Sequence, residues 1–256
     1  LFKELTFRTQ YSIDYNQGTA NVFWNPFYGD GTTFGGLSYR GITLLYAQNF
    51  ANTVKFDKTF GIHHINFVGG MEVFRQRVES TTAQRSGFTF ATPTQPSYGT
   101  VQTNSGDVEA YRLQSYFGRA GYDIDDKYHL SLSLRTDGST RFADSSRWGV
   151  FYAAGVAWNL DREKFMSNIA WLSELKLKAS YGTQGNQGLP GSFPYLGTYS
   201  SGANIGAASG YIINTVGNGE LTWETQKQLD LGIEFGVFNN RITGSFVYFR
   251  RESDKL

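Results

Sequence analysis

The feature that most constrains this chain is the alternation of apolar and polar residues on both sides of Asn239-Asn240. Successive side chains of a strand point to opposite faces, so each flank has one apolar and one polar face. Two asparagines tolerate the positive φ of a tight hairpin turn, and a turn here aligns the two apolar faces. The sequence therefore predicts a β-hairpin over residues 229–251. Its predicted pairs are Leu231 with Tyr248, Ile233 with Phe246, Phe235 with Gly244, Val237 with Ile242, Glu234 with Ser245 and Gly236 with Thr243.

Similar alternation earlier in the chain predicts further strands, so that about nine are expected in all. The earlier strands are predicted at residues 5–16, 41–60, 65–77, 111–122, 128–135, 148–160 and 175–181. Their connections alternate between short turns and long polar loops. The long loops are predicted at 17–40, 78–107, 136–147 and 183–222. Residues 161–171 are expected to form a short helical turn with Asp161 as its N-cap.

These patterns favour an all-β chain that crosses a membrane. The longest nearly apolar run, residues 149–158, is shorter than the roughly 20 residues of a membrane helix but matches the roughly 9–11 of a membrane β-strand. Long loops on one side, short turns on the other and aromatic residues near the ends of an apolar face are typical of membrane β-barrels. We therefore predict an all-β fold, part of a large antiparallel transmembrane β-barrel. A soluble β-rich binding module is the alternative, although its turns would recur about every 8–12 residues.

Nine strands do not complete a bacterial barrel, because such barrels normally have an even number of strands. Further strands are therefore expected outside residues 1–256, and we expect the chain to be an internal piece of a longer protein. Because long and short connections alternate, the Asn239-Asn240 turn is predicted on the side of the short turns.

The residues suggest no catalytic set and no cofactor site. A net charge of +1 gives no reason to expect nucleic acid, and there is no cysteine for disulfide or thiolate chemistry. His63 and His64 would point apart on extended chain, so a turn is expected there instead of a metal site. Asp123, Asp125 and Asp126 lack the glycine and distal glutamate of a calcium loop, which favours a polar turn. We predict no enzyme, metal or cofactor; a passive porin or an outer-membrane hydrolase is the alternative.

Three sets of residues are candidates for contacts in such a barrel. Aromatic residues of the long loops could stack on sugar rings or anchor a partner, although loop packing is the simpler explanation for any one of them. They are Trp24, Phe27, Tyr28, Tyr195, Tyr199 and Tyr211. Alternation assigns to the lumen Arg8, Glu72, Lys176, Lys178, Asp230 and Glu234. It assigns to lipid Leu130, Leu132, Leu134, Leu231, Ile233, Phe235, Val237 and Phe246.

Several motifs follow one another in order from the fifth predicted strand onward. They are residues 134–142 (LRTDGSTRF), 147–151 (RWGVF), Trp158, 163–166 (EKFM), 175–187 (LKLKASYGTQGNQ), 221–226 (LTWETQ) and 238–245 (FNNRITGS). Together they resemble the SusC/RagA-type TonB-dependent outer-membrane transporters. Residues 1–100 fit less distinctively, by their strand pattern.

The resemblance implies a 22-stranded barrel, of which residues 1–256 would be a partial TonB-dependent-receptor β-barrel domain from the C-terminal half. It also implies a Gram-negative outer-membrane location and an N-terminal plug outside this chain. Energy would come from the TonB–ExbB–ExbD complex, and a SusD-like lipoprotein would cover the outer loops. The implied function is active import of a bulky nutrient, a glycan or an oligopeptide.

Overall fold

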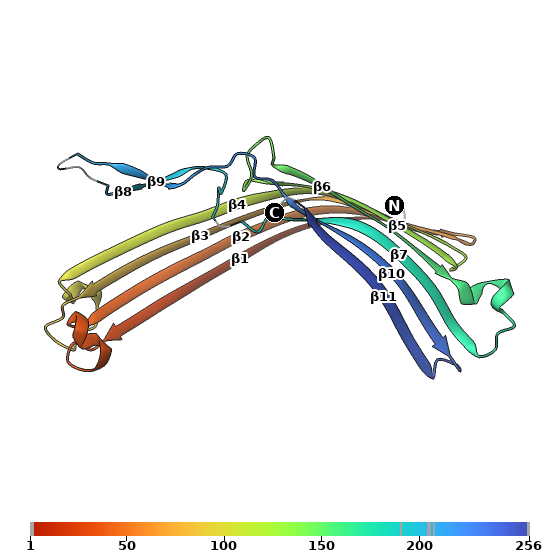
Figure 1. Ribbon diagram of the computed structural model, residues 1–256, viewed down its shortest axis with the longest axis horizontal. Helices are drawn as coiled ribbons and strands as arrows, with labels where there is room; N and C mark the ends of the chain where they lie inside the picture. The colour runs from red at the N-terminus through yellow and green to blue at the C-terminus, as the bar shows by residue number, and fades with distance from the viewer. Residues whose placement is uncertain (1–2, 190, 204–205, 207, 255–256) are drawn as a thin grey trace. The chain divides into compact units, whose positions relative to one another are not determined.

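The computed structural model describes residues 3–254 apart from 190, 204–205 and 207. Its main element is a sheet in which strands adjacent in sequence are paired, except that β10 lies beside β7 (Figure 1). In the described part of the chain this sheet has nine strands, and β8 pairs with β9 separately. The strands are β1 Leu5–Trp24, β2 Leu37–Phe60, β3 His63–Ser86, β4 Val101–Ile124, β5 Tyr128–Ser139, β6 Trp148–Asn159, β7 Leu172–Asn186, β8 Thr198–Ser201, β9 Tyr211–Thr215, β10 Glu224–Val237 and β11 Ile242–Asp254. The predicted all-β fold is confirmed.

Short 3-10 helices lie in the connections. They are η1 Gly29–Phe34, η2 Pro96–Tyr98, η3 Leu160–Arg162 and η4 Lys164–Met166. Over the described residues, no helix is both long enough and apolar enough to cross a membrane.

The chain forms two compact units, of which the smaller contains residues 11–49 and 74–112. In this unit the connection after β1 packs against the connection after β3. The Phe88 N–H donates to the Gly35 carbonyl at 2.7 Å, and the buried Phe88 ring lies edge-on to Phe23 at 5.3 Å between centroids. The Ser38 hydroxyl, fully buried, donates to the Thr94 carbonyl at 2.7 Å. Buried rings and backbone hydrogen bonds therefore order both connections.

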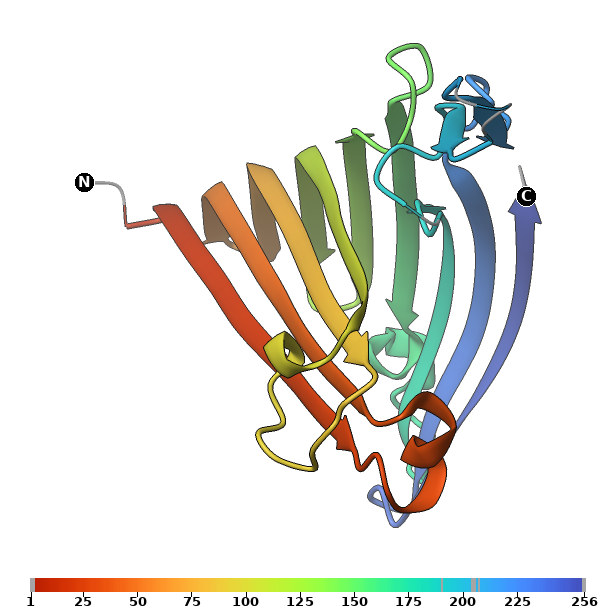
Figure 2. The ribbon, with the colours of Figure 1, turned by 90° about the vertical axis from the view of Figure 1, so that its left-hand side faces the viewer.

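The larger unit contains residues 1–10, 50–73 and 113–256. Its strands are paired so that the apolar face and the polar face each continue from one strand to the next. Directly paired residues share a face, and Figure 2 shows β4 to β7, β10 and β11, yellow-green to blue, side by side. One apolar row contains Ile124, Tyr128, Trp158, Leu177, Ile233 and Phe246, and the next contains Tyr122, Leu130, Val156, Ala179, Leu231 and Tyr248. On the opposite face one row contains Asp123, His129, Ala157, Lys178, Gly232 and Val247, and the next contains Gly121, Ser131, Gly155, Ser180, Asp230 and Phe249.

The hairpin of β10 and β11 has the predicted register at all six predicted pairs. Asn239 and Asn240 have φ of 57° and 59°, as a primed turn requires. The Arg241 N–H donates to the Phe238 carbonyl at 3.4 Å and closes the turn. The turn residues therefore set the register that puts both apolar sets on one face.

The first strands are longer than predicted. β1 continues to Trp24, β3 continues to Ser86 and β4 begins at Val101, so the predicted loop 78–107 shortens to 87–100. The added residues are mostly polar on both faces, so they show no alternation from which a strand could be predicted. Strand pairing rests on backbone hydrogen bonds, which do not require apolar side chains, so the pairing continues through these residues.

Two predictions about the connections are wrong. Residues 136–139 continue β5 and do not belong to a loop. The side chains of Asp137 and Ser139 in this segment are buried. Asp161 is not an N-cap, because η3 begins one residue earlier and its N-cap is Asn159. The Asp161 carboxylate instead accepts a hydrogen bond from the Leu175 N–H at 3.1 Å, which ties η3 to β7.

The turn geometry predicts the effect of a substitution at Asn239. Asn239→Ala should cost about 1 kcal/mol of unfolding free energy, because alanine lacks the short polar side chain whose local hydrogen bonds make left-handed backbone accessible to asparagine. Asn239→Gly should cost almost nothing, because glycine adopts positive φ readily. Chemical unfolding of the two variants checks the difference. Equal stability of the alanine and glycine variants would contradict a turn whose φ values set the register.

Candidate functional site

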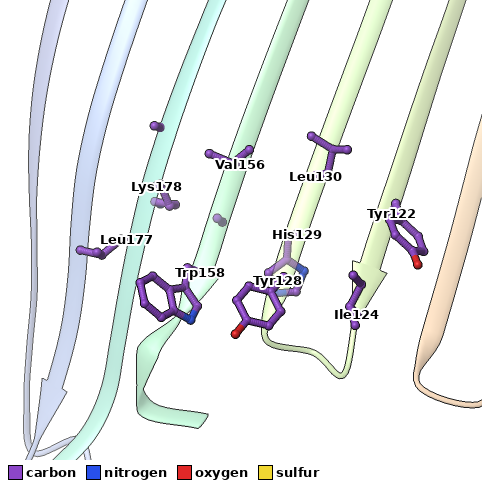
Figure 3. A pocket seen from close by; sticks show the side chains of 11 residues that line it. Tyr122, Ile124, Tyr128, His129, Leu130, Val156, Trp158, Leu177 and Lys178 are labelled. Atoms are coloured by element: carbon purple, nitrogen blue, oxygen red, sulfur yellow. The ribbon is translucent and has the colours of Figure 1, made fainter. Parts of the chain in front are cut away.

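The apolar face of the larger unit has a hollow of about 680 Å³ near the short turns (Figure 3). Its lining comes from four adjacent strands, β4 to β7, and includes Tyr122, Tyr128, Leu130, Val156, Trp158, Leu177 and Ala179. Of the residues assigned to lipid, Leu130, Leu132, Leu134, Leu231, Ile233 and Phe246 are exposed on this face. Phe235 and Val237 are half-buried, and Phe235 stacks on Phe246 at 6.1 Å. The face is apolar, and its contact with lipid stays a prediction.

Two aromatic side chains at the turn end of this hollow have their polar groups fixed by one carboxylate. The Tyr128 hydroxyl donates to Glu163 Oε1 at 2.5 Å, and the Trp158 indole N–H donates to the same atom at 3.1 Å. The two rings stack at 6.1 Å. The hydrogen bond from Tyr128, with that from Trp158, lowers the pKa of the Glu163 carboxyl, which lies in the connection between β6 and β7. Aromatic residues with an apolar body and a bound polar tip suit a membrane–water boundary.

The opposite face carries charges, most of them paired. Lys178 forms an ion pair with Glu234, and Lys176 is the direct strand partner of Glu234. Asp230 lies on the same face, beside Ser180 of β7. Arg8 is exposed on β1. The structure therefore brings Lys176, Lys178, Asp230 and Glu234 together, while their assignment to a lumen stays a prediction.

Arg135 organises the polar face where β5 approaches its long connection. Its Nε donates to the Asp137 carboxylate at 2.8 and 2.9 Å, and its Nη2 donates to the buried Ser115 hydroxyl at 2.8 Å. Glu72 Oε2 lies 3.6 Å from Nη2, and the guanidinium lies over the Phe117 ring at 5.5 Å from its centroid. Glu72, also assigned to the lumen, is thus part of a polar cluster drawn from three strands, β3, β4 and β5.

Beside this cluster, three buried rings fasten the connections onto the polar face. Phe142, from the β5–β6 connection, has no exposed surface, and Phe151 and Trp223 are buried against it. The centroid of the Trp223 ring lies 5.2 Å from Phe142 and 5.5 Å from Phe151. Glycine is required on both sides of Phe151: a Cβ on Gly185 would come within 2.1 Å of its ring and one on Gly149 within 2.5 Å. These rings form a packed core that fixes the connections to the strands, and we call it the loop anchor.

Hydrogen bonds to backbone complete this anchor. Arg141 Nη1 donates to the carbonyls of Gln187 and Leu189 at 3.2 and 2.9 Å, which joins the β5–β6 connection to the chain after β7. The Trp223 indole N–H donates to the Arg147 carbonyl at 2.9 Å. Four of the motifs that carried the family resemblance, at 134–142, 147–151, 175–187 and 221–226, therefore meet in one place. Sequence reasoning found the motifs but not their convergence, because no local pattern shows which loops touch.

The loop aromatics do not form one cluster within either unit. In the smaller unit Trp24 is the last residue of β1, which corrects its assignment to a loop, and it packs on Phe34 at 5.9 Å. Phe27 and Tyr28 are exposed in the connection that follows. In the larger unit Tyr195 lies edge-on to Phe193. Tyr199 and Tyr211 belong to β8 and β9, not to an unstructured loop, and are 70% and 71% exposed. A role in binding stays a prediction for all six.

Two groups of residues were considered as metal sites and predicted to be turns instead, and both can now be placed in the structure. His63 and His64 begin β3 and do point to opposite faces, but the turn precedes them, at 61–62. Asp125 Oδ2 lies 2.9 Å from Lys127 Nζ, and this hydrogen bond lowers the pKa of the Asp125 carboxyl. Asp126 pairs with Arg162 at 3.0 Å. Across the described residues, no group of three or more histidines and acids could hold a metal ion.

Comparison with known proteins places residues 2–256 within the family model described as TonB dependent receptor-like, beta-barrel. TonB-dependent receptor P3 of Formosa agariphila is 31% identical over 229 residues, which is 85% of this chain and 22% of that protein. TonB-dependent receptor SusC of Bacteroides thetaiotaomicron is 29% identical over 253 residues, 95% of this chain and 25% of that protein. The chain thus spans about a quarter of the length of these curated relatives.

A solved structure supports the same similarity. The RagAB peptide transporter superimposes with a TM-score of 0.91 at 26% identity, over 99% of this chain and 29% of that chain. The strand order described above is therefore that of a known barrel wall.

The loop anchor predicts a large cost for removing its central ring. Phe142→Ala should lower the free energy of unfolding by about 3–5 kcal/mol, because it leaves a cavity where a fully buried ring was. Chemical unfolding measures this, and proteolysis of the β5–β6 connection should accelerate. The control is Phe165→Ala in η4, where the ring is 64% exposed and the cost should stay below about 0.5 kcal/mol. A loop that resists protease as well in Phe142→Ala as in the control would contradict the anchoring role.

Proposed function

Because this chain belongs to the TonB-dependent receptor β-barrel family, of the SusC/RagA type, we propose that it forms part of the wall of an outer-membrane importer for bulky nutrients. The observation that supports a membrane wall most directly is the continuous apolar face of β4 to β11. Rows of Leu, Ile, Val and aromatic residues continue through six neighbouring strands, and most of their side chains are exposed. Soluble monomers rarely expose contiguous apolar surface of this extent.

The polar face supports a water-filled or plug-filled lumen. Its charges form pairs such as Lys178 with Glu234 and Arg135 with Asp137, which water or a polar protein surface can solvate. In a barrel wall, the side chains opposite the lipid face must point into the lumen. Arg8, Glu72, Lys176, Lys178, Asp230 and Glu234 would then line the path of the cargo or contact a plug supplied by residues outside this chain.

The whole transporter would need parts that lie outside residues 1–256. A plug would close the barrel, the TonB–ExbB–ExbD complex would supply energy from the periplasm, and a SusD-like lipoprotein would cover the outer loops. The relatives' names support these proposals, since one is SusC and the solved structure is a peptide transporter. The cargo would be a glycan or an oligopeptide, and the step would be transport without covalent chemistry. The exposed aromatics of β8 and β9 are our candidates for contact with the lipoprotein or the cargo.

The membrane assignment predicts that arginine at two neighbouring positions of β5 has very different effects on the free energy of unfolding. Leu132 lies near the middle of the roughly 9–11 residues that a strand needs to span the bilayer, counted from Tyr128. Leu132→Arg should therefore cost about 2–4 kcal/mol in lipid. Ser131→Arg is the matched control, because Ser131 faces the other way, between Gly121 and Gly155, which leave room for a long side chain. Unfolding in lipid vesicles measures both, and equal small costs would refute a lipid-facing β5.

The importer assignment predicts what accompanies the full-length protein. Purified from outer membranes in mild detergent, it should carry a surface lipoprotein together with bound peptides or glycans, which mass spectrometry identifies. Tyr199→Ala with Tyr211→Ala should reduce the amount of lipoprotein or ligand retained. Phe165→Ala, at the turn end of the wall, should leave both unchanged. Isolation without any lipoprotein, and a chain sequence without a plug, would contradict energised import.

A further inference from the structure

A chain of hydrogen bonds joins side chains of five consecutive strands on the polar face, beside the short turns. His64 Nε2 lies 3.1 Å from Asp57 Oδ1, and His64 Nδ1 lies 2.9 Å from Asp123 Oδ2. The other oxygen of Asp123 lies 2.6 Å from His129 Nδ1. His129 Nε2 lies 3.1 Å from Asn159 Nδ2. All five residues belong to the larger unit.

The partners of His64 determine its protonation. Both of its ring nitrogens face carboxylate oxygens, and an ionised carboxylate can only accept hydrogen bonds. A neutral imidazole carries one N–H, so it satisfies one of these carboxylates and turns a lone pair toward the other. With both nitrogens protonated, His64 donates to Asp57 and Asp123 together. The geometry therefore requires an imidazolium.

The partners of His129 are of a different kind. Asn159 Nδ2 also donates to the Asp126 carbonyl at 2.7 Å, which orients the amide with its NH₂ group toward the turn and His129. An NH₂ group donates, so His129 Nε2 must accept and carries no proton. Its proton is on Nδ1, which donates to Asp123. His129 thus faces one carboxylate and one amide, whereas His64 faces two carboxylates.

We propose that His64, as a charged link between Asp57 and Asp123, is a proton-dependent clasp that holds β2, β3 and β4 together at the turn end of the sheet. Release of the proton would remove one hydrogen bond and leave two carboxylates facing a neutral ring. The inference concerns the wall itself and does not depend on the cargo.

The charged groups around the clasp are compatible with this role. From β2, Asp57 faces His64 and also pairs with Lys55 at 3.1 Å; from β4 the facing group is Asp123, which also contacts His129 of β5. His64 is the second residue of β3, whose 24 residues far exceed the roughly 9–11 that span a bilayer. The clasp therefore lies at the end of the strand, at the level of Tyr128 and the short turns.

The direction of the pH effect follows from linkage. The folded protein holds this proton more tightly than the unfolded chain, because two carboxylates accept from the ring only in the fold. The stabilisation is therefore complete below the ordinary histidine pKa of about 6.5 and is lost as pH rises and folded His64 deprotonates. Thermal unfolding of the full-length protein, followed between about pH 6 and pH 9, should show a midpoint that falls by several degrees more than in His64→Gln.

His129→Gln is the matched control within the same network. It removes a hydrogen bond to Asp123 and should lower the midpoint, but it should leave the pH dependence of the wild type, because both carboxylates that accept from His64 remain in place. The proposal is overturned if His64→Gln keeps the wild-type pH dependence, or if His129→Gln abolishes it and His64→Gln does not.

A spectroscopic measurement tests the protonation of His64 independently of the stability of the protein. With ¹⁵N-labelled histidine, the signals that disappear in His64→Gln and in His129→Gln identify the two rings in the folded protein. At about pH 7.5, above the ordinary pKa, the ring nitrogens of His64 should have imidazolium shifts. A neutral His64 ring at that pH would refute the clasp, whatever the unfolding curves show.

Discussion

The interaction on which the rest of this structure depends is the backbone hydrogen-bond ladder that fixes each strand's register against the next. Side chains alternate with a period of two, so a slip of one residue would exchange the apolar and polar faces of a whole strand. The register is kept from β4 through β11, which is why Tyr128, Trp158 and Leu177 fall in one row although long connections separate their strands. The two-sided wall follows from that register.

The long connections are constrained by packing onto the wall. Phe142, Phe151 and Trp223 form a small core on the polar face, and Arg141 and the Trp223 indole tie separate connections together through backbone carbonyls. This core explains why the motifs with the family resemblance include so many glycines and aromatics. The rings fill the space, and Gly149 and Gly185 leave room for them. Those motifs mark where loops are fixed, and the binding of cargo would fall to exposed residues around them.

The polar face distributes its charge by pairing across strands. Arg135 contacts Asp137, Ser115 and Glu72, and His64 contacts Asp57 and Asp123. Each of these two cationic side chains therefore has partners on two neighbouring strands. Such links act beside the backbone ladder and concentrate at the two ends of β5. One end lies under the anchored loops and the other beside the short turns. The middle of the same face, around Ser131, Gly155 and Ser180, is lined by small residues.

The sequence by itself determined the strands with strict alternation, the hairpin register, the turn at Asn239-Asn240 and the family, because each depends on local periodicity or on ordered motifs. The family resemblance is confirmed by the match over residues 2–256. Only the tertiary structure decided where the polar ends of β1, β3 and β4 pair, because both faces of those segments are polar and no period marks them. It also decided the loop anchor and the His64 network. Their residues are far apart in the chain, and only the register of intervening strands brings Asp57, His64, Asp123 and His129 within hydrogen-bonding distance.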